Sequence, residues 1–406
     1  MKVSIFNITF YIIIFFSVLN PILAGFFTEG IGLVYKTYTF ILLMAAFLAV
    51  KKYRGNKLNN ILLNPATCFL YYLIFQTTIT VITAGNKLHN IVYELSTYLL
   101  PCLAILVVSI LVSKYNDGKV CRLINFFIYA ATLSLVVDAL GYGDIFAGRY
   151  KEALLERFGV KQLHGFLPWP NAMATLLVVF GVIQQILKPK TVAYKIGYLS
   201  TIATLTRTYI LASLVLLVTS IKGRGKKILV GALLFFLSYL SFGALKESTY
   251  ELISPDTVYR LRYVWASFDV MNDYPIFGIG LGRLSDAAIW KNDKFSFHNH
   301  YGMPSELYTR AQGSWEMASS DTSLTIFAEI GFIGTLLLVL QLFWFIRIAI
   351  KTNSREFMLV LIPMAASFYS TAGMLFSFTF GVFYWFLYGM LISKYYDQNT
   401  TMPQPT

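Results

Sequence analysis

The chain has 406 residues, of which 57% are hydrophobic and only 13% are charged, and its mean hydropathy is +0.62. Soluble domains carry about a quarter of their residues charged, so this composition excludes an ordinary soluble globular protein and indicates a chain that lies mostly in lipid. The net charge of +13 would suggest a nucleic-acid partner in a soluble protein, and it is interpreted below on the membrane topology.

Apolar runs of about 20 residues dominate the chain, and a helix of that length crosses a hydrocarbon core of about 30 Å. Twelve such candidates can be marked, so we predict an all-α integral membrane protein with about 12 transmembrane helices. Residues 1–406 then form a single polytopic membrane domain. The predicted spans are 4–24, 32–50, 62–84, 93–113, 119–141, 166–187, 193–206, 208–222, 228–246, 321–346, 356–375 and 378–395.

The basic residues orient these spans. Predicted inner segments such as 51–57 and 222–227 are rich in Lys and Arg, and together the inner segments hold few of the 20 acidic residues. Because positively charged segments stay on the cytoplasmic side, we predict that both chain termini are cytoplasmic. The basicity is therefore an orientation signal, and the partners it indicates are membrane lipids and no nucleic acid.

A hairpin of two short helices is predicted between Lys188 and Lys222. The residues between them are fewer than the roughly 40 that two full spans would take. Their junction, 204–208, would then lie below the outer surface, where Arg207 costs at least about 2.5 to 3.5 kcal/mol and calls for an anionic partner. One long tilted helix is the alternative, but it would place the basic segment 222–227 outside, against the charge bias.

A long polar segment, residues 247–320, interrupts the apolar pattern between predicted spans 9 and 10. The orientation places it on the non-cytoplasmic face as one large loop. Loops of this length without a function are uncommon in compact proteins, so we expect the chemistry of the protein here.

Three sequence patterns occur in order. They are Gly165 to Ala174 with Pro170-Asn171 inside it, TLTRTYILASLVLLV around Arg207, and a longer pattern made of Arg260 to Trp265, Pro275 to Gly282 and Ala328 to Gly334. In their order and spacing, and in the topology around them, these patterns resemble the O-antigen ligase and O-antigen polymerase family. The resemblance covers roughly residues 160–340, and that family handles lipid-linked sugars at the outer face of the bacterial inner membrane.

The resemblance implies a multi-pass protein of the bacterial cell inner membrane with its active site on the periplasmic side, so that 247–320 is a periplasmic loop. The implied enzyme is a glycosyltransferase that moves a glycan from undecaprenyl pyrophosphate to a sugar hydroxyl, with no nucleotide sugar, cofactor or metal. The chain contains no Asp-x-Asp, the usual metal site of nucleotide-sugar transferases. Polymerases of the family are expected to work with a chain-length regulator protein.

A polymerase and a ligase of this family differ in the acceptor that receives the glycan. Ligases of the family place a His-Asn pair about nine residues before a Glu-x-Gly, whereas this chain has Ser320-Asp321 there and His298-Asn299 too early. This departure favours an oligosaccharide repeat-unit polymerase over an O-antigen ligase, which would transfer the glycan to lipid A core. A polysaccharide transporter or flippase is the third possibility, although no paired halves typical of transporters are visible.

Candidate site residues follow from this chemistry. A pyrophosphate leaving group needs fixed cations, and the planar fork of Arg binds phosphate oxygens in pairs. The acceptor hydroxyl needs a base, for which an imidazole or a carboxylate raised in pKa by burial is suited. The pyrophosphate-binding candidates are Arg207 first, then Arg260, Arg262 and Arg283, and the candidates for the base are His298, His300, Asp321 and Glu329.

Structural interpretations compete with each of these roles. Arg207 can anchor a short helix at the headgroups, the two histidines can be ordinary loop residues, and Glu329 can bond a neighbouring span. The glycines at 278, 280 and 282 lack the strand and helix that give a phosphate loop its meaning, so they predict a tight turn. Asn171 after Pro170 is first a helix-start signal and second a sugar contact.

Overall fold

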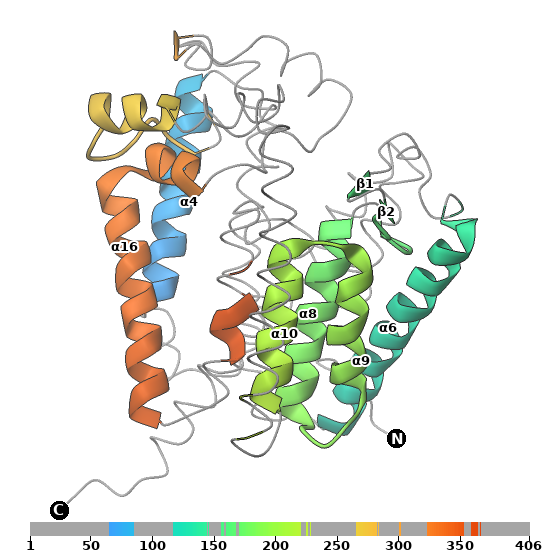
Figure 1. The fold of residues 1–406 in the computed structure, drawn as a ribbon. Helices are drawn as coiled ribbons and strands as arrows, with labels where there is room; N and C mark the ends of the chain where they lie inside the picture. The colour runs from blue at the N-terminus through green and yellow to red at the C-terminus, as the bar shows by residue number, and fades with distance from the viewer. Residues whose placement is uncertain are drawn as a thin grey trace, which may run out of the picture.

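The computed structural model describes part of the chain, and that part is helical apart from one short β ladder (Figure 1). The described residues are 65–84, 117–143, 145, 156–157, 160–167, 170–220, 225, 228, 265–281, 283, 300–301, 323–352, 359–363 and 366. The principal elements are α4 (Pro65–Ala84), α6 (Asp117–Val137), the π-helical turn η2 (Asp138–Tyr142), β1 (Glu156–Arg157), β2 (Val160–Lys161), α8 (Pro170–Leu187), α9 (Ala193–Ser200), the 3₁₀ turn η4 (Thr201–Thr204), α10 (Arg207–Ser220) and α16 (Ser323–Thr352).

Three helices among the described residues are long and apolar enough to cross a membrane: Cys121–Tyr142, Pro170–Leu187 and Phe327–Trp344. They coincide with predicted spans 119–141, 166–187 and 321–346, and α4 coincides with 62–84. The predicted helical membrane fold is therefore confirmed in this part of the chain. The predicted spans 4–24, 32–50, 93–113 and 378–395, and most of 228–246 and 356–375, lie outside the described residues.

The short ladder is the one departure from the all-α prediction in the described part. Strands β1 and β2 pair antiparallel, with Glu156 opposite Lys161 and Arg157 opposite Val160. A ladder of this size is a hairpin inside the connection between α6 and α8. The hairpin leaves the helical fold unchanged. It sets the starting position of the segment 162–167, which follows β2.

The predicted hairpin of two short helices is confirmed. Helix α9 continues through the 3₁₀ turn η4, and α10 returns beside them, so the alternative of one long tilted helix is wrong. The turn is made by Leu205, whose φ of 50° and ψ of 23° are left-handed. Non-glycine residues adopt this conformation uncommonly, so the junction stores strain that its surroundings must hold.

Helix α8 is the centre of a bundle in which α6, α9 and α10 surround it (Figure 1). Almost every side chain of α8 is buried, which is what an apolar helix without a polar stripe requires. Each of its two glutamines makes a side-chain hydrogen bond inside the bundle. Gln185 accepts a hydrogen bond from the Tyr198 hydroxyl at 2.8 Å, and Gln184 donates one to the Thr191 hydroxyl at 3.1 Å.

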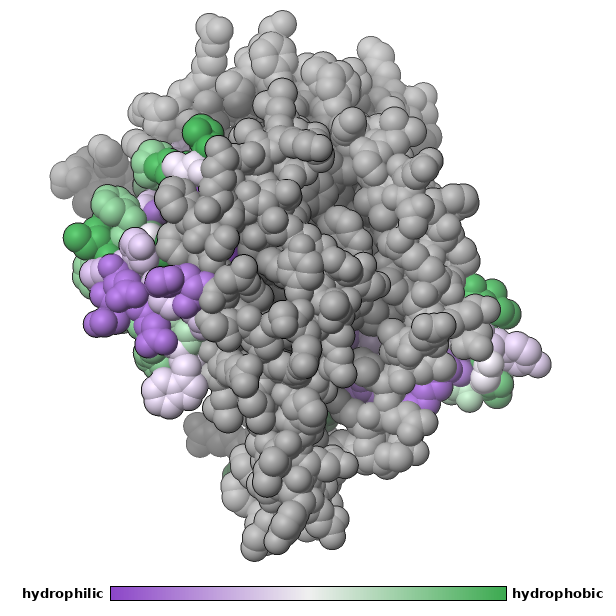
Figure 2. Space-filling model, turned by 90° about the horizontal axis from the view of Figure 1, so that it is seen from above, coloured by the Kyte–Doolittle hydropathy of each residue, from purple (hydrophilic) through white to green (hydrophobic). Residues whose placement is uncertain are grey.

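Helices α4 and α16 form the second group and pack against each other (Figure 1). Seen from above, the described surface appears at two opposite edges of the molecule, with hydrophilic and hydrophobic residues mixed at each (Figure 2). Such a mixture is expected where helices leave the hydrocarbon and enter the headgroup region.

Candidate active site

Helix α16 is broken at Gly331, close to its outer end as the topology predicts it. The backbone of Gly331 has φ 63° and ψ −168°, a conformation that is essentially restricted to glycine. A Cβ atom at this position would lie 2.2 Å from the backbone nitrogen of Gly278. The break therefore requires glycine for two reasons. Other residues do not adopt this backbone conformation, and a side chain would collide with the segment that contains Gly278.

The segment 275–280 fills the break and satisfies the backbone groups that the helix gives up. The bonds are Ile279 N–H to the Ala328 carbonyl (3.4 Å), Gly280 N–H to the Glu329 carbonyl (3.0 Å), Phe332 N–H to the Pro275 carbonyl (2.8 Å) and Ile333 N–H to the Ile276 carbonyl (3.1 Å). Irregular backbone at membrane depth is tolerated only where protein or water satisfies it. Donors and acceptors are exchanged in both directions, so the segment and the helix form one unit.

Helix α4 holds the same unit from the other side. The Tyr72 hydroxyl donates to the Ile330 carbonyl at 2.7 Å, and the Gln76 amide donates to the Phe277 carbonyl at 2.9 Å and to the Tyr72 oxygen at 2.7 Å. Gln76 is buried, so its bonds replace those that water would otherwise make.

Replacing Gln76 by leucine is expected to lower the free energy of unfolding by about 1 to 3 kcal/mol, because the Phe277 carbonyl loses its side-chain donor in a buried place. Thermal unfolding of the purified protein in detergent measures this. Thr78→Val is the matched control, since the Thr78 hydroxyl donates only within α4, to the Ile74 carbonyl. Equal midpoints for the two variants would show that α4 does not hold the segment.

The glycine-containing segment places two predicted site residues on this unit. Glu329 lies two residues before the break and is 1% exposed, while Arg283, just after the segment, is 5% exposed. The Arg283 guanidinium donates to the Thr83 hydroxyl of α4. The glycines at 278 and 280 were predicted to make a tight turn, and the structure shows that they make the close contact to α16 and α4. The structure thus joins segments more than 40 residues apart in the sequence.

A second group of contacts surrounds the start of α10, where Arg207 is the first helical residue. The Gln162 amide donates to the Leu205 carbonyl at 3.3 Å, and the Leu163 N–H donates to the Ala203 carbonyl at 3.4 Å. The Thr206 hydroxyl donates to the Asn171 side-chain oxygen at 3.2 Å. The pattern around Pro170-Asn171 therefore meets the pattern around Arg207, and Asn171 holds the junction by its side chain.

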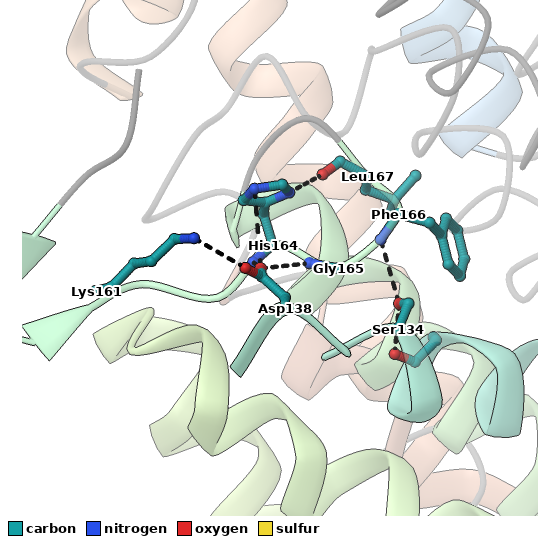
Figure 3. A network of polar contacts seen from close by, with 8 residues as sticks. Ser134, Asp138, Lys161, His164, Gly165, Phe166 and Leu167 are labelled. Carbon is teal, nitrogen blue, oxygen red and sulfur yellow. Dashed lines mark hydrogen bonds and ion pairs between the residues drawn. The ribbon is translucent and has the colours of Figure 1, made fainter. Parts of the chain in front are cut away.

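A buried carboxylate that the sequence interpretation missed lies next to this junction. Asp138 is 1% exposed, accepts hydrogen bonds from the backbone N–H groups of His164 (2.8 Å) and Gly165 (3.0 Å), and forms an ion pair with Lys161 at 3.1 Å (Figure 3). The available signal was its place within predicted span 119–141, because an ionisable residue inside a span is a functional candidate by default.

The ring of His164 completes this network. Its Nδ1 lies 2.8 Å from the Leu167 carbonyl, and because a carbonyl only accepts, Nδ1 carries the proton in the neutral ring (Figure 3). Its Nε2 lies 3.8 Å from the nearer Asp138 oxygen. The imidazole thus adds to the contacts that tie the 161–167 segment to α6.

The predicted base His300 is exposed and lies edge-to-face against Tyr301, with ring centroids 5.0 Å apart. The Tyr301 hydroxyl donates to Asp273 at 2.9 Å, at the end of the short helix 265–273. Burial, followed by the hydrogen bond to Asp273, raises the pKa of Tyr301 far above neutral pH, so its hydroxyl remains a donor. The candidates His298, Asp321, Arg260 and Arg262 lie outside the described residues.

Residues 195–339 match the model of the O-antigen ligase family. This segment, which is less than half of the chain, is similar to that family. The family segment begins in α9 and ends in α16, so it contains the hairpin with Arg207, the glycine-containing segment and the broken helix with Glu329. Helix α4 with Gln76, and helix α6 and the turn η2 with Asp138, precede it. No curated protein matches the chain.

Proposed function

We propose that the protein polymerises lipid-linked oligosaccharide repeat units, of O-antigen or of a capsular or exopolysaccharide, by moving the growing glycan from undecaprenyl pyrophosphate onto a new repeat unit. The family segment points to glycan transfer in a membrane. Ser320-Asp321, at the place where ligases of the family carry His-Asn, favours a repeat unit as the acceptor over lipid A core.

The observation that carries this proposal is the joined unit of α16 and segment 275–280. It fixes a buried acidic residue, Glu329, and a buried cation, Arg283, on one rigid backbone framework near the end of a span. Buried ionisable residues in a span are expensive and mark sites of chemistry. Groups held on such a framework keep their geometry, as catalytic groups must.

In the proposed reaction an acceptor hydroxyl oxygen attacks the anomeric carbon of the donor glycan. The bond from that carbon to the phosphate oxygen breaks, undecaprenyl pyrophosphate leaves with the electron pair, and the hydroxyl proton passes to the base. Arg207 neutralises the pyrophosphate, with Arg260, Arg262 and Arg283 as further cations. The base is one of His298, His300, Asp321 and Glu329, and no metal takes part.

The proposed enzyme lies in the bacterial inner membrane and works on lipid-linked substrates. The site faces the periplasm from the bacterial inner membrane, beneath the loop 247–320 of a single domain. The donor and the acceptor are both carried by membrane lipids, and a chain-length regulator protein is a further partner. Supporting this orientation is the charge bias of the sequence, and the α9–α10 junction and the broken end of α16 both lie toward the upper ends of the helices (Figure 1).

A ligase is the second candidate, favoured by the description of the family that residues 195–339 match. Deletion of the gene in its host separates the candidates by the glycan that accumulates. A missing polymerase leaves lipid A core that bears one repeat, whereas a missing ligase leaves long polymer on the carrier lipid. Accumulation of single carrier-bound repeats on the cytoplasmic side would instead indicate a flippase and contradict the transferase proposal.

A further inference from the structure

The carboxylate of Asp138 is buried at a place where an ionised group is costly, so its contacts must compensate the charge. They are two backbone N–H donors, from His164 and Gly165, and the Lys161 ammonium group. Hydrogen bonds to a charged acceptor contribute about 1.5 to 3 kcal/mol each, more than neutral ones. The chain therefore uses a buried charge to hold the segment 161–167 at the end of α6.

The space around Asp138 is shaped for this segment. A Cβ atom on Gly165 would lie 2.3 Å from the Ser134 hydroxyl, which accepts the Phe166 N–H at 3.2 Å. A Cβ atom on Gly143 would lie 1.9 Å from an oxygen of Asp138. A side chain at Gly143 would displace the carboxylate, and one at Gly165 would displace the Ser134 side chain and would adopt a left-handed backbone conformation.

The other side of the same segment holds the strained junction before α10. Gln162 and Leu163 donate to the carbonyls of Leu205 and Ala203, on the turn where Leu205 is left-handed. Strained backbone persists only where its surroundings fix it. A continuous set of contacts thus runs from Asp138 through 162–165 to the turn before α10, whose first residue is Arg207. Figure 3 shows the part of this set around Asp138.

We propose that Asp138 is a positioning residue for the pyrophosphate of the donor, acting through segment 161–167 and the Leu205 turn on Arg207. This inference rests on the proposed function, since it assigns Arg207 the pyrophosphate. Asp138, the first residue of η2, precedes the family segment 195–339, so the donor site is positioned in part from outside that segment. A purely structural Asp138 would affect stability alone, whereas a positioning residue affects the affinity for the pyrophosphate only while Arg207 is present.

The test measures binding of undecaprenyl pyrophosphate to the purified full chain in nanodiscs, for Asp138→Ala in the Arg207 and Arg207→Ala backgrounds. Asp138→Ala is expected to weaken binding roughly tenfold in the first background, since small misplacements of a binding group are costly. In the Arg207→Ala background it is expected to change binding by less than about twofold, because groups that act together are not additive.

Two further variants separate the charge from the hydrogen bonds. Asp138→Asn keeps an oxygen for the His164 and Gly165 N–H groups and is expected to lose roughly threefold. Ser134→Ala releases the Phe166 N–H, while its other bond, to the Ala131 carbonyl, lies within α6; it is expected to lose about as much, again only while Arg207 is present. Thr78→Val is the control, since the Thr78 hydroxyl donates within α4, to the Ile74 carbonyl; its binding should equal that of the wild type.

Equal losses in both Arg207 backgrounds, or wild-type binding by Asp138→Ala, would overturn the positioning role. If Asp138→Ala does not accumulate in the membrane, the same comparison with Asp138→Asn and Ser134→Ala decides in its place. Failure of the proposed function appears differently: the wild type would not bind undecaprenyl pyrophosphate, or Arg207→Ala would bind it as well as the wild type does.

Discussion

Replacement of Arg207 by alanine is expected to lower the rate of polymer formation by about 100-fold to 1,000-fold, because a developing charge on the leaving group loses a fixed donor. Arg207→Lys keeps the charge but not the planar fork, so it is expected to remain strongly impaired. The measurement is complementation of a deletion strain at matched membrane levels, with the surface glycan separated on a gel. Both variants should leave single-repeat product.

Arg122→Ala is the matched control for this experiment. Arg122 is an exposed arginine of α6 whose side chain donates within its own helix, to the Gly118 carbonyl at 3.4 Å. Its variant should give full ladders. Full ladders from both Arg207 variants as well would mean that Arg207 anchors a short helix in the headgroup region, and that the donor site lies elsewhere.

Gly331→Ala is expected to abolish accumulation of folded protein. A side chain at Gly331 must adopt a conformation restricted to glycine and would place its Cβ 2.4 Å from the Phe277 carbonyl carbon, which is backbone and cannot turn away. Gly278→Ala meets the same obstacle from the other side, since its Cβ would lie 2.4 Å from the Glu329 carbonyl oxygen. Yield and monodispersity after detergent extraction measure both effects.

Gly225→Ala controls for the substitution itself. Gly225 is helical and exposed, and a Cβ atom there would meet nothing within 4 Å, so alanine should be tolerated or slightly stabilising. A Gly331→Ala protein that extracts and unfolds like the Gly225→Ala protein would contradict the joined unit of α16 and 275–280.

The hairpin of α9 and α10 could be predicted because two independent sequence quantities agreed. The distance from Lys188 to Lys222 is too short for two full spans, and the basic residues that follow Lys222 require an even number of crossings. Length and charge act locally along the chain, so a sequence shows them directly. The exact turn at Leu205 could not be predicted, because a leucine has no intrinsic preference for left-handed backbone.

The break in α16 was not predicted, since residues 321–346 form one continuous apolar run whose pattern indicates an unbroken helix. What permits the break is a set of hydrogen bonds to a segment about 50 residues earlier and to Tyr72 on α4. These hydrogen-bond partners are far away in the sequence, so the only local sign of the break is the presence of glycines. The segment 275–282 was selected for its glycines, but their close contact to α16 needed the three-dimensional structure.

Asp138 was missed for a different reason. The chemistry of the leaving group points to cations, and the candidates for the base lie in the outer loop and at the start of the span after it. A carboxylate near the end of predicted span 119–141 fitted neither role, although its depth alone marked it. Its role depends on the backbone N–H groups of residues 164 and 165, and a pattern of side chains does not predict such donors.

The most direct test of polymerase activity uses the purified full chain in liposomes with one substrate only, undecaprenyl pyrophosphate carrying a single repeat unit. We expect a ladder of carrier-linked glycans, with one undecaprenyl pyrophosphate released for each bond formed and with no divalent cation required. If no ladder forms, and glycan is transferred only after lipid A core is added, the protein is a ligase and the central claim is wrong.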